Sequence, residues 1–233
     1  MGRVLMDITE RVAHTTAAQD EALAVVSSIP DAEYAAPSAL PSWTVGHVVA
    51  HLIGNCEAQA RQIEYAARGE AIEVYTGGQE FREAEIQRRA VLAPAQLRAE
   101  LAAQHERFSA ATQGIDESLA IAPVEYRSGT VADVVNGRWM ESLVHAVDLG
   151  QPQYTWRSWD EPFCRVLIDY VLERLPADRT VRLRATNCDF DITTGTGALV
   201  NIEADIADIA GFLSDRGPSL SDEITLGPYP ADH

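Results

Sequence analysis

The spacing of apolar residues changes near residue 155, and this change constrains the fold more than any other feature of the sequence. Before it, apolar positions recur at the three- and four-residue spacing of amphipathic helices, as in residues 5–28. After it, TVRLRAT, DFDITT and ALVNIEAD alternate apolar and polar residues, as half-buried strands do. A length of 233 residues allows one large domain or two small ones, and we assign two, at 1–152 and 153–233.

Breaker and capping residues divide the first domain into about four long helices. We expect helices over the following stretches: 5–28, 45–68, from about Gln79 onward, 94–115 and 131–150, with a short extended piece around VEYRSGT. Ser42 or Thr44 can cap the second helix, and Pro94 suits the first position of another. Gly69 and Gly150 fit helix C-terminal stops. Four packed helices predict a four-helix bundle.

The second domain reads as a small α+β unit. Residues 162–175 suit a helix, the three alternating stretches suit strands, and DIADIAGFLSDRG suits a short helix that ends at Gly217. The fold class we expect is therefore an N-terminal helical bundle followed by a small α+β domain.

The composition of the chain limits the classes of binding partner that we expect. A net charge of -17 repels nucleic acid phosphates and anionic lipid, so we expect no nucleic-acid partner. No run of eighteen apolar residues exists, and the N-terminal stretch lacks the regions of a signal peptide, so we expect a cytoplasmic protein that crosses no membrane. The three cysteines, Cys56, Cys164 and Cys188, form no metal-knuckle pattern and are interpreted as buried small residues. Monomer and homodimer both stay open.

Two helices carry polar residues at one-turn spacing. Glu141 and His145 are four residues apart, as are His47 and His51, and each pair can share a helix face. Two imidazoles and a carboxylate suit zinc or another divalent first-row metal. The spacing alone fits ordinary polar residues on a helix equally well. Asp148 suits either a partner of a ligand or a solvent-exposed helix end.

A resemblance favours the metal site. LPSWTVGHVVAHLIGNCEA, followed by RWMESLVHAVDLG, resembles the mycothiol-dependent maleylpyruvate isomerase family, which joins a DinB-like bundle to a sterol-carrier-like domain. The resemblance implies that His51, Glu141 and His145 bind the metal, and that the metal is zinc. It also implies mycothiol as an external thiol, which agrees with Cys56 being turned away from the ligand face of its helix. His47 is then a candidate near the cofactor, and Trp43 is interpreted as a packing residue of the bundle.

The same resemblance implies a reaction and its alternatives. The thiolate adds to the cis double bond of a maleylpyruvate-like enoyl acid, the new single bond rotates, and elimination gives the trans isomer. Arg82 and Arg216 match in position the arginines that the family places near the site, where they would act in catalysis by binding an anionic small-molecule substrate. Arg216, like His47, is also a candidate for binding the thiol cofactor. A mycothiol S-transferase on the same scaffold and a non-catalytic metal- or ligand-binding protein are the alternatives.

Overall fold

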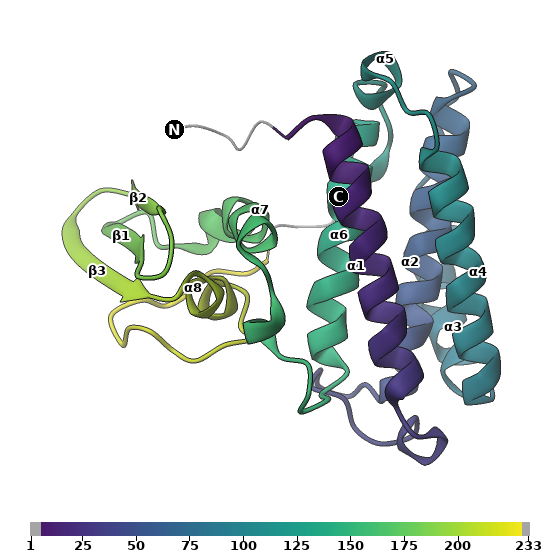
Figure 1. The fold of residues 1–233 in the computed structure, drawn as a ribbon, viewed down its shortest axis with the longest axis horizontal. Helices are drawn as coiled ribbons and strands as arrows, with labels where there is room; N and C mark the ends of the chain where they lie inside the picture. Colours follow the sequence, from purple (N-terminus) through teal and green to yellow (C-terminus); the bar gives the residue numbers. More distant parts are fainter. Residues whose placement is uncertain (1–5, 230–233) are drawn as a thin grey trace. The chain divides into compact units, whose positions relative to one another are not determined.

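The computed structural model of the protein describes residues 6–229. The chain divides into two compact units, and the boundary lies between Gln151 and Pro152 (Figure 1). Within the described range, no helix combines the length and the apolar character that a membrane crossing would need.

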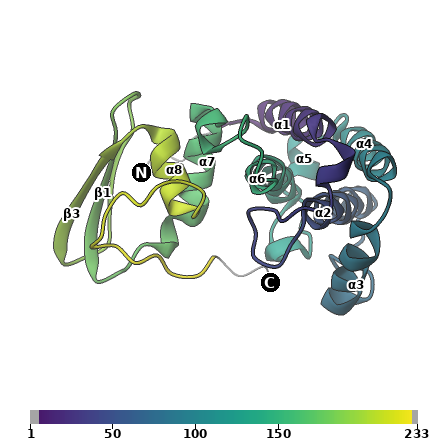
Figure 2. The same cartoon turned by 90° about the horizontal axis from the view of Figure 1, so that it is seen from below.

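The first unit is a bundle of long helices. Its members are α1 (Ile8–Ser28), α2 (Val45–Ala66), α4 (Pro94–Thr112) and α6 (Val131–Asp148). Helix α1 packs against α4 and α6, and α2 packs against the same two helices. Figure 2 shows the four nearly end-on, with α3 (Gly78–Ala90) outside them beside α2. A single turn of helix, α5 (Glu117–Ala120), precedes α6. The expected four-helix bundle is confirmed.

Local chemistry explains where these helices begin and end. The Thr44 side chain accepts a hydrogen bond from a backbone N–H of the first turn of α2, so Thr44 rather than Ser42 is the cap. Pro94 is the first residue of α4, where its missing N–H leaves no helical bond unmade. Gly150 follows α6 with a φ of 72°, a left-handed conformation that ends a helix at no steric cost for glycine.

The stretch before α6 differs from the extended piece that we expect. It forms a single 3-10 turn, Tyr126–Ser128, and only Pro123 and Thr130 pair as an isolated bridge. The side-chain carbonyl of Gln62 accepts hydrogen bonds from two consecutive backbone N–H groups at this turn. The expectation is wrong because a contact from α2, distant in sequence, determines the local conformation.

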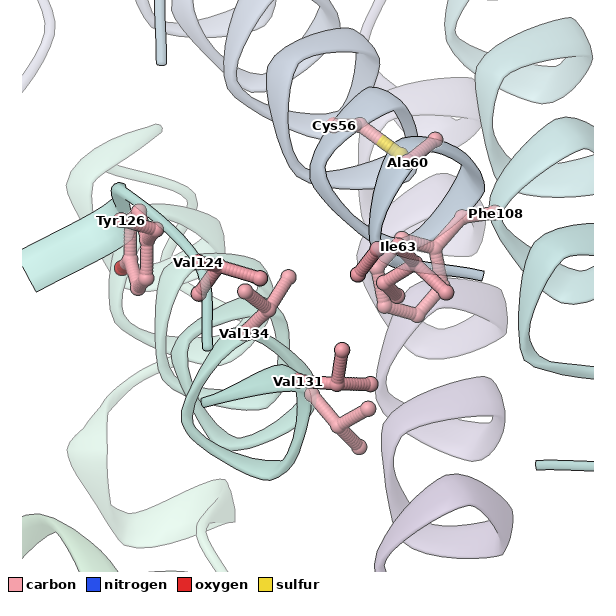
Figure 3. Packing of buried hydrophobic residues seen from close by; sticks show 10 residues of the cluster. Cys56, Ala60, Ile63, Phe108, Val124, Tyr126, Val131 and Val134 are labelled. Carbon is pink, nitrogen blue, oxygen red and sulfur yellow. The ribbon is translucent and has the colours of Figure 1, made fainter. Parts of the chain in front are cut away.

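One apolar cluster fills the end of the bundle away from the N-terminus of α2 (Figure 3). It joins α2, α4 and α6 through fully buried side chains, among them Cys56, Ile63, Phe108 and Val131. Truncating a buried phenylalanine to alanine typically costs about 3–5 kcal/mol, so Phe108 alone contributes much of the bundle's stability.

The second unit packs two helices with a three-stranded sheet. Its elements are α7 (Glu161–Val171), β1 (Arg179–Ala185), β2 (Asp191–Thr194), β3 (Ala198–Ala204) and α8 (Ile206–Leu213). The strand order is β2-β1-β3, with β2 antiparallel and β3 parallel to β1. Helix α8 packs on β1 and β3, where Val181, Leu183 and Ile202 are buried. The expected fold class, a helical bundle followed by a small α+β domain, is confirmed.

Candidate metal centre and its pocket

Two capped helices present the candidate ligands. Thr44 caps α2, and Thr130 caps α6, where its backbone N–H donates to the carboxylate of Asp133 at 2.8 Å. His51 therefore lies in the second turn of α2, and the pair Glu141 and His145 lies on one face of α6.

The side chains of His51, Glu141 and His145 meet between these two helices. Nε2 of His51 is 3.0 Å from Oε2 of Glu141, and Nε2 of His145 is 3.2 Å from the same oxygen. One donor atom from each residue lies within 4.8 Å of the other two. Two ligand atoms on a tetrahedral zinc are about 3.3 Å apart at ordinary bond lengths. The donor set therefore fits one divalent cation with a coordination position left for another ligand.

Burial and neighbouring charge give the two imidazoles opposite protonation preferences. Burial, helped by the nearby His145, lowers the pKa of His51 to about 4. Burial also acts to lower the pKa of His145, but hydrogen bonds with Asp148 and Glu141 outweigh it and raise that pKa to about 9. Burial acts to raise the pKa of Glu141, yet hydrogen bonds from both imidazoles hold it well below its usual range. Near pH 7, a cation must therefore displace a proton from His145.

Asp148 is the partner of a candidate ligand and not a solvent-exposed helix end. Its side chain is buried, and Oδ2 lies 2.8 Å from Nδ1 of His145. A carboxylate only accepts hydrogen bonds when ionised, so Nδ1 of His145 carries a proton and Nε2 turns toward Glu141.

His47 is directed away from the three candidate ligands. Its Nδ1 is 2.7 Å from Oγ1 of Thr44, and its Nε2 is 3.1 Å from Oε1 of Gln87. These contacts join the start of α2 to α3, and a role of His47 in cofactor binding stays a prediction. Trp43, expected as a packing residue, is half-exposed, and its ring centroid is 5.7 Å from that of His51.

Arg82 of α3 contacts a candidate ligand directly. Its Nη2 is 3.1 Å from Nδ1 of His51, and its guanidinium lies 5.4 Å from the ring centroid of Tyr75. A guanidinium only donates, so Nδ1 of His51 accepts and the ring proton lies on Nε2. All three residues line a cavity of about 170 Å³ between α2, the loop at residues 74–76 and α3.

Arg138, which the sequence analysis overlooked, ties α6 to α2. Its side chain is fully buried and donates to the carbonyl of Leu52 at 3.3 Å and to Oδ1 of Asn55 at 2.9 Å. Leu52 follows the candidate ligand His51, and Arg138 precedes Glu141 by three residues. The cross-link therefore maintains the helix spacing at the site. A charged residue within the apolar stripe of α6 is the signal that could have revealed it.

Arg216 follows α8 in the second unit. Its Nη1 donates to the carbonyl of Ser214 at 2.6 Å and to the hydroxyl of Tyr229. Its guanidinium lies 5.3 Å from the ring centroid of Tyr229. A contact between Arg216 and substrate stays a prediction.

The protein's own thiols are poor sources of a thiolate. Cys56 and Cys164 are buried, as expected, whereas Cys188 is partly exposed, so the expectation of a buried residue is wrong there. Cys188 lies in the connection between β1 and β2. Burial raises the pKa of all three thiols, that of Cys164 to about 12. Thiol chemistry at this site therefore needs a sulfur from outside the chain.

Known proteins share both the sequence pattern and the fold. A family model described as the mycothiol maleylpyruvate isomerase N-terminal domain matches residues 15–150, a range that holds all three candidate ligands. A crystal structure of the mycothiol-dependent maleylpyruvate isomerase superimposes with a TM-score of 0.80 at 23% identity, covering 97% of this chain and 95% of the other. A histidine-to-alanine mutant of that isomerase gives the same values. At this identity the structural likeness shows a common fold. No curated protein matches the sequence.

Proposed function

Since the chain belongs to the mycothiol maleylpyruvate isomerase family, we propose that it is a metal- and mycothiol-dependent cis-trans isomerase of maleylpyruvate-like enoyl acids. The observation that carries the proposal is the convergence of His51, Glu141 and His145 beside a cavity lined by Arg82. Two solved structures of the same fold, both of a mycothiol-dependent maleylpyruvate isomerase, support it.

The chemistry of the three side chains suits a divalent metal. His51 and His145 would each provide Nε2, and Glu141 would provide Oε2, a set that zinc accepts. When bound, the metal supplies a cation that lowers the pKa of a thiol, and mycothiol supplies the sulfur whose reversible addition to the double bond permits rotation.

The position of the proton on each imidazole determines which ring nitrogen can bind a metal. Asp148 holds a proton on Nδ1 of His145, which leaves Nε2 as the ligand atom. For His51 to offer Nε2, its ring proton must move to Nδ1, which now accepts from Arg82. Two N–H groups cannot share a hydrogen bond, so this tautomer releases the guanidinium of Arg82.

Arg82 is then placed to bind the anionic substrate. A conjugated keto acid accumulates negative charge on its carbonyl oxygen when a nucleophile adds, and a cation fixed nearby stabilises that charge. The ring of Tyr75 lies against the guanidinium of Arg82 and restricts its movement. In a chain with a net charge of -17, such a locally cationic surface is what an anionic substrate requires.

The test combines zinc-loaded protein, mycothiol and maleylpyruvate, and follows the product and the free thiol together. We expect the trans isomer to form while the thiol concentration stays constant. Glu141→Gln should abolish turnover, whereas Glu64→Gln, which alters a glutamate of α2 paired with Arg107, should preserve it. Consumption of one thiol per substrate would instead identify an S-transferase, and no reaction with zinc and mycothiol present would refute the proposal.

A further inference from the structure

The cavity beside the candidate ligands extends along α2 to another arginine, Arg61. His51 and Arg61 both line it and lie ten residues apart on the same helix. At 1.5 Å per residue, their Cα atoms are about 15 Å apart along the helix axis. Asn55 and Ala58 lie between them at three- or four-residue steps and also line the cavity. One face of α2 therefore forms a wall of the cavity, with the candidate ligand His51 at one end and the cationic Arg61 at the other.

The guanidinium of Arg61 is available for binding. Its acidic neighbours on α2 are Glu57, four residues before it, and Glu64, three residues after it. Glu57 accepts a hydrogen bond from Arg89 at 3.0 Å, and Glu64 accepts two from Arg107, at 2.7 and 2.8 Å. Arg61 acts on Glu64 only as a nearby charge. Across residues 6–229, Arg61 makes no hydrogen bond or ion pair.

Arg89 and Arg82, the other two arginines that line the cavity, differ in how many carboxylates lie near them. Arg89 is neutralised by contacts within 3.8 Å of three carboxylates, those of Glu57, Glu85 and Glu100. Among the carboxylates of residues 6–229, Arg82 forms an ion pair with that of the exposed Glu83 alone, at 3.7 Å. Arg82, beside the candidate ligand His51, and Arg61, at the far end of the cavity, are therefore less compensated by carboxylates than Arg89 is.

Apolar side chains of Val74, Phe81 and Ile86 also line the cavity, together with the carboxylates of Glu57 and Glu85, both of which pair with Arg89. Helical side chains lean toward the helix N-terminus, so the Arg61 side chain extends back toward His51 and shortens the gap to on the order of 10 Å. A ligand with a hydrocarbon centre and a carboxylate at each end matches this arrangement.

We propose that Arg61 binds the distal carboxylate of a dicarboxylic electrophile whose reactive end lies at His51, Glu141 and His145. The identity of that reactive end rests on the proposed function, whereas carboxylate binding by Arg61 needs neither metal nor thiol. Because Arg61 is remote from the reacting atoms, it contributes to affinity and to selection of substrate length and not to the chemical step.

Calorimetry on the full chain tests carboxylate binding. The probes are adipate, suberate and sebacate, each compared with the monocarboxylate of equal length. The wild-type protein should bind one of the three diacids at least about tenfold tighter than its monoacid, as a charge-assisted hydrogen bond in a half-buried site allows. Arg61→Gln should remove that preference. Arg68→Gln, just beyond the end of α2 and outside the cavity, should retain it.

Two results overturn the inference. One is a wild-type protein that binds diacids and monoacids equally, and the other is an Arg61→Gln variant, folded by circular dichroism, that keeps the diacid preference.

Steady-state kinetics separate the inference from the proposed function. With zinc and mycothiol present, Arg61→Gln should raise KM for a dicarboxylic enoyl acid about tenfold and leave kcat unchanged. An Arg61-dependent diacid preference without any isomerisation would refute the proposed function alone. Isomerisation with an unchanged KM in Arg61→Gln would refute the role of Arg61 alone.

Discussion

Asp148→Asn tests how a buried carboxylate controls cation binding at the candidate metal centre. Asp148 is 2% exposed, and its Oδ2 lies 2.8 Å from Nδ1 of His145. With a pKa of about 9, roughly 99% of His145 is doubly protonated at pH 7, whereas His51, with a pKa of about 4, is roughly 0.1% protonated. A cation that binds the wild-type protein at pH 7 should therefore release close to one proton, and that proton comes from His145.

The substitution keeps the side-chain shape of Asp148 and removes its charge. The hydrogen bond with Asp148 is the strongest of the interactions that raise the pKa of His145, so we expect that pKa to fall by about one unit or more, which is about 1.4 kcal/mol per unit. At pH 8, proton release should then fall from about 0.9 in the wild type to about 0.5 or less. Well above pH 9, where protons compete little for His145, loss of its partner should weaken metal affinity by about 10- to 100-fold.

The assay is calorimetric titration of the metal-free protein with zinc at pH 8 in Hepes and in Tris. The slope of the observed enthalpy against the ionisation enthalpy of the buffer gives the number of protons released. A zinc-bound water can release a proton in both proteins. The difference in proton release between Asp148→Asn and the wild type is therefore the quantity that tests the role of Asp148. Asp169→Asn, an exposed aspartate of α7, is the control and should match the wild type. Equal proton release from Asp148→Asn and the wild type would show that Asp148 does not control the protonation of His145.

Three further predictions concern the ligands and the bundle. His51→Ala should retain less than about 0.1 equivalent of zinc by elemental analysis with unchanged circular dichroism, and full occupancy would contradict its role as a ligand. Burial lowers the pKa of His105 to about 3, so between pH 6.5 and 3 the unfolded state binds more protons than the folded state. The free energy of unfolding therefore falls as the pH is lowered, by about 3 kcal/mol at pH 4.5. Denaturant unfolding at pH 7 and at pH 4.5 measures this loss of stability, and His105→Leu should reduce it. A loss as large as in the wild type would contradict the role of His105. In Gly46→Ala the new Cβ would lie 2.5 Å from the carbonyl oxygen of Ala90, so we expect a loss of about 1–3 kcal/mol, and a wild-type melting temperature would contradict it.

Much of the fold could be predicted because local signals and tertiary structure agree. Thr44, Pro94 and Gly150 each act where their chemistry is most favourable, at a cap, at a first helical position and after a helix end. The stretch around Tyr126 could not be predicted, because its conformation depends on hydrogen bonds that its backbone N–H groups donate to Gln62 in another helix. Local preference yields to such contacts wherever a distant side chain satisfies the backbone.

The candidate site could be predicted only in part. Helical spacing indicates that Glu141 and His145 share a face, but nothing local selects His51 over His47 as their partner across 90 residues. The rotation of α2 about its axis decides that choice, and it turns His47 toward Gln87 of α3. Arg61 and Arg138 have no motif, and their roles emerge from which neighbours are already paired.

The most direct test of the metal centre is anomalous diffraction from crystals of the zinc-loaded wild-type protein, measured on both sides of the zinc absorption edge. We expect one strong anomalous peak about 2.0–2.2 Å from Nε2 of His51, Nε2 of His145 and a carboxylate oxygen of Glu141. A fully loaded protein with its zinc peak elsewhere, and none between these three side chains, would contradict it.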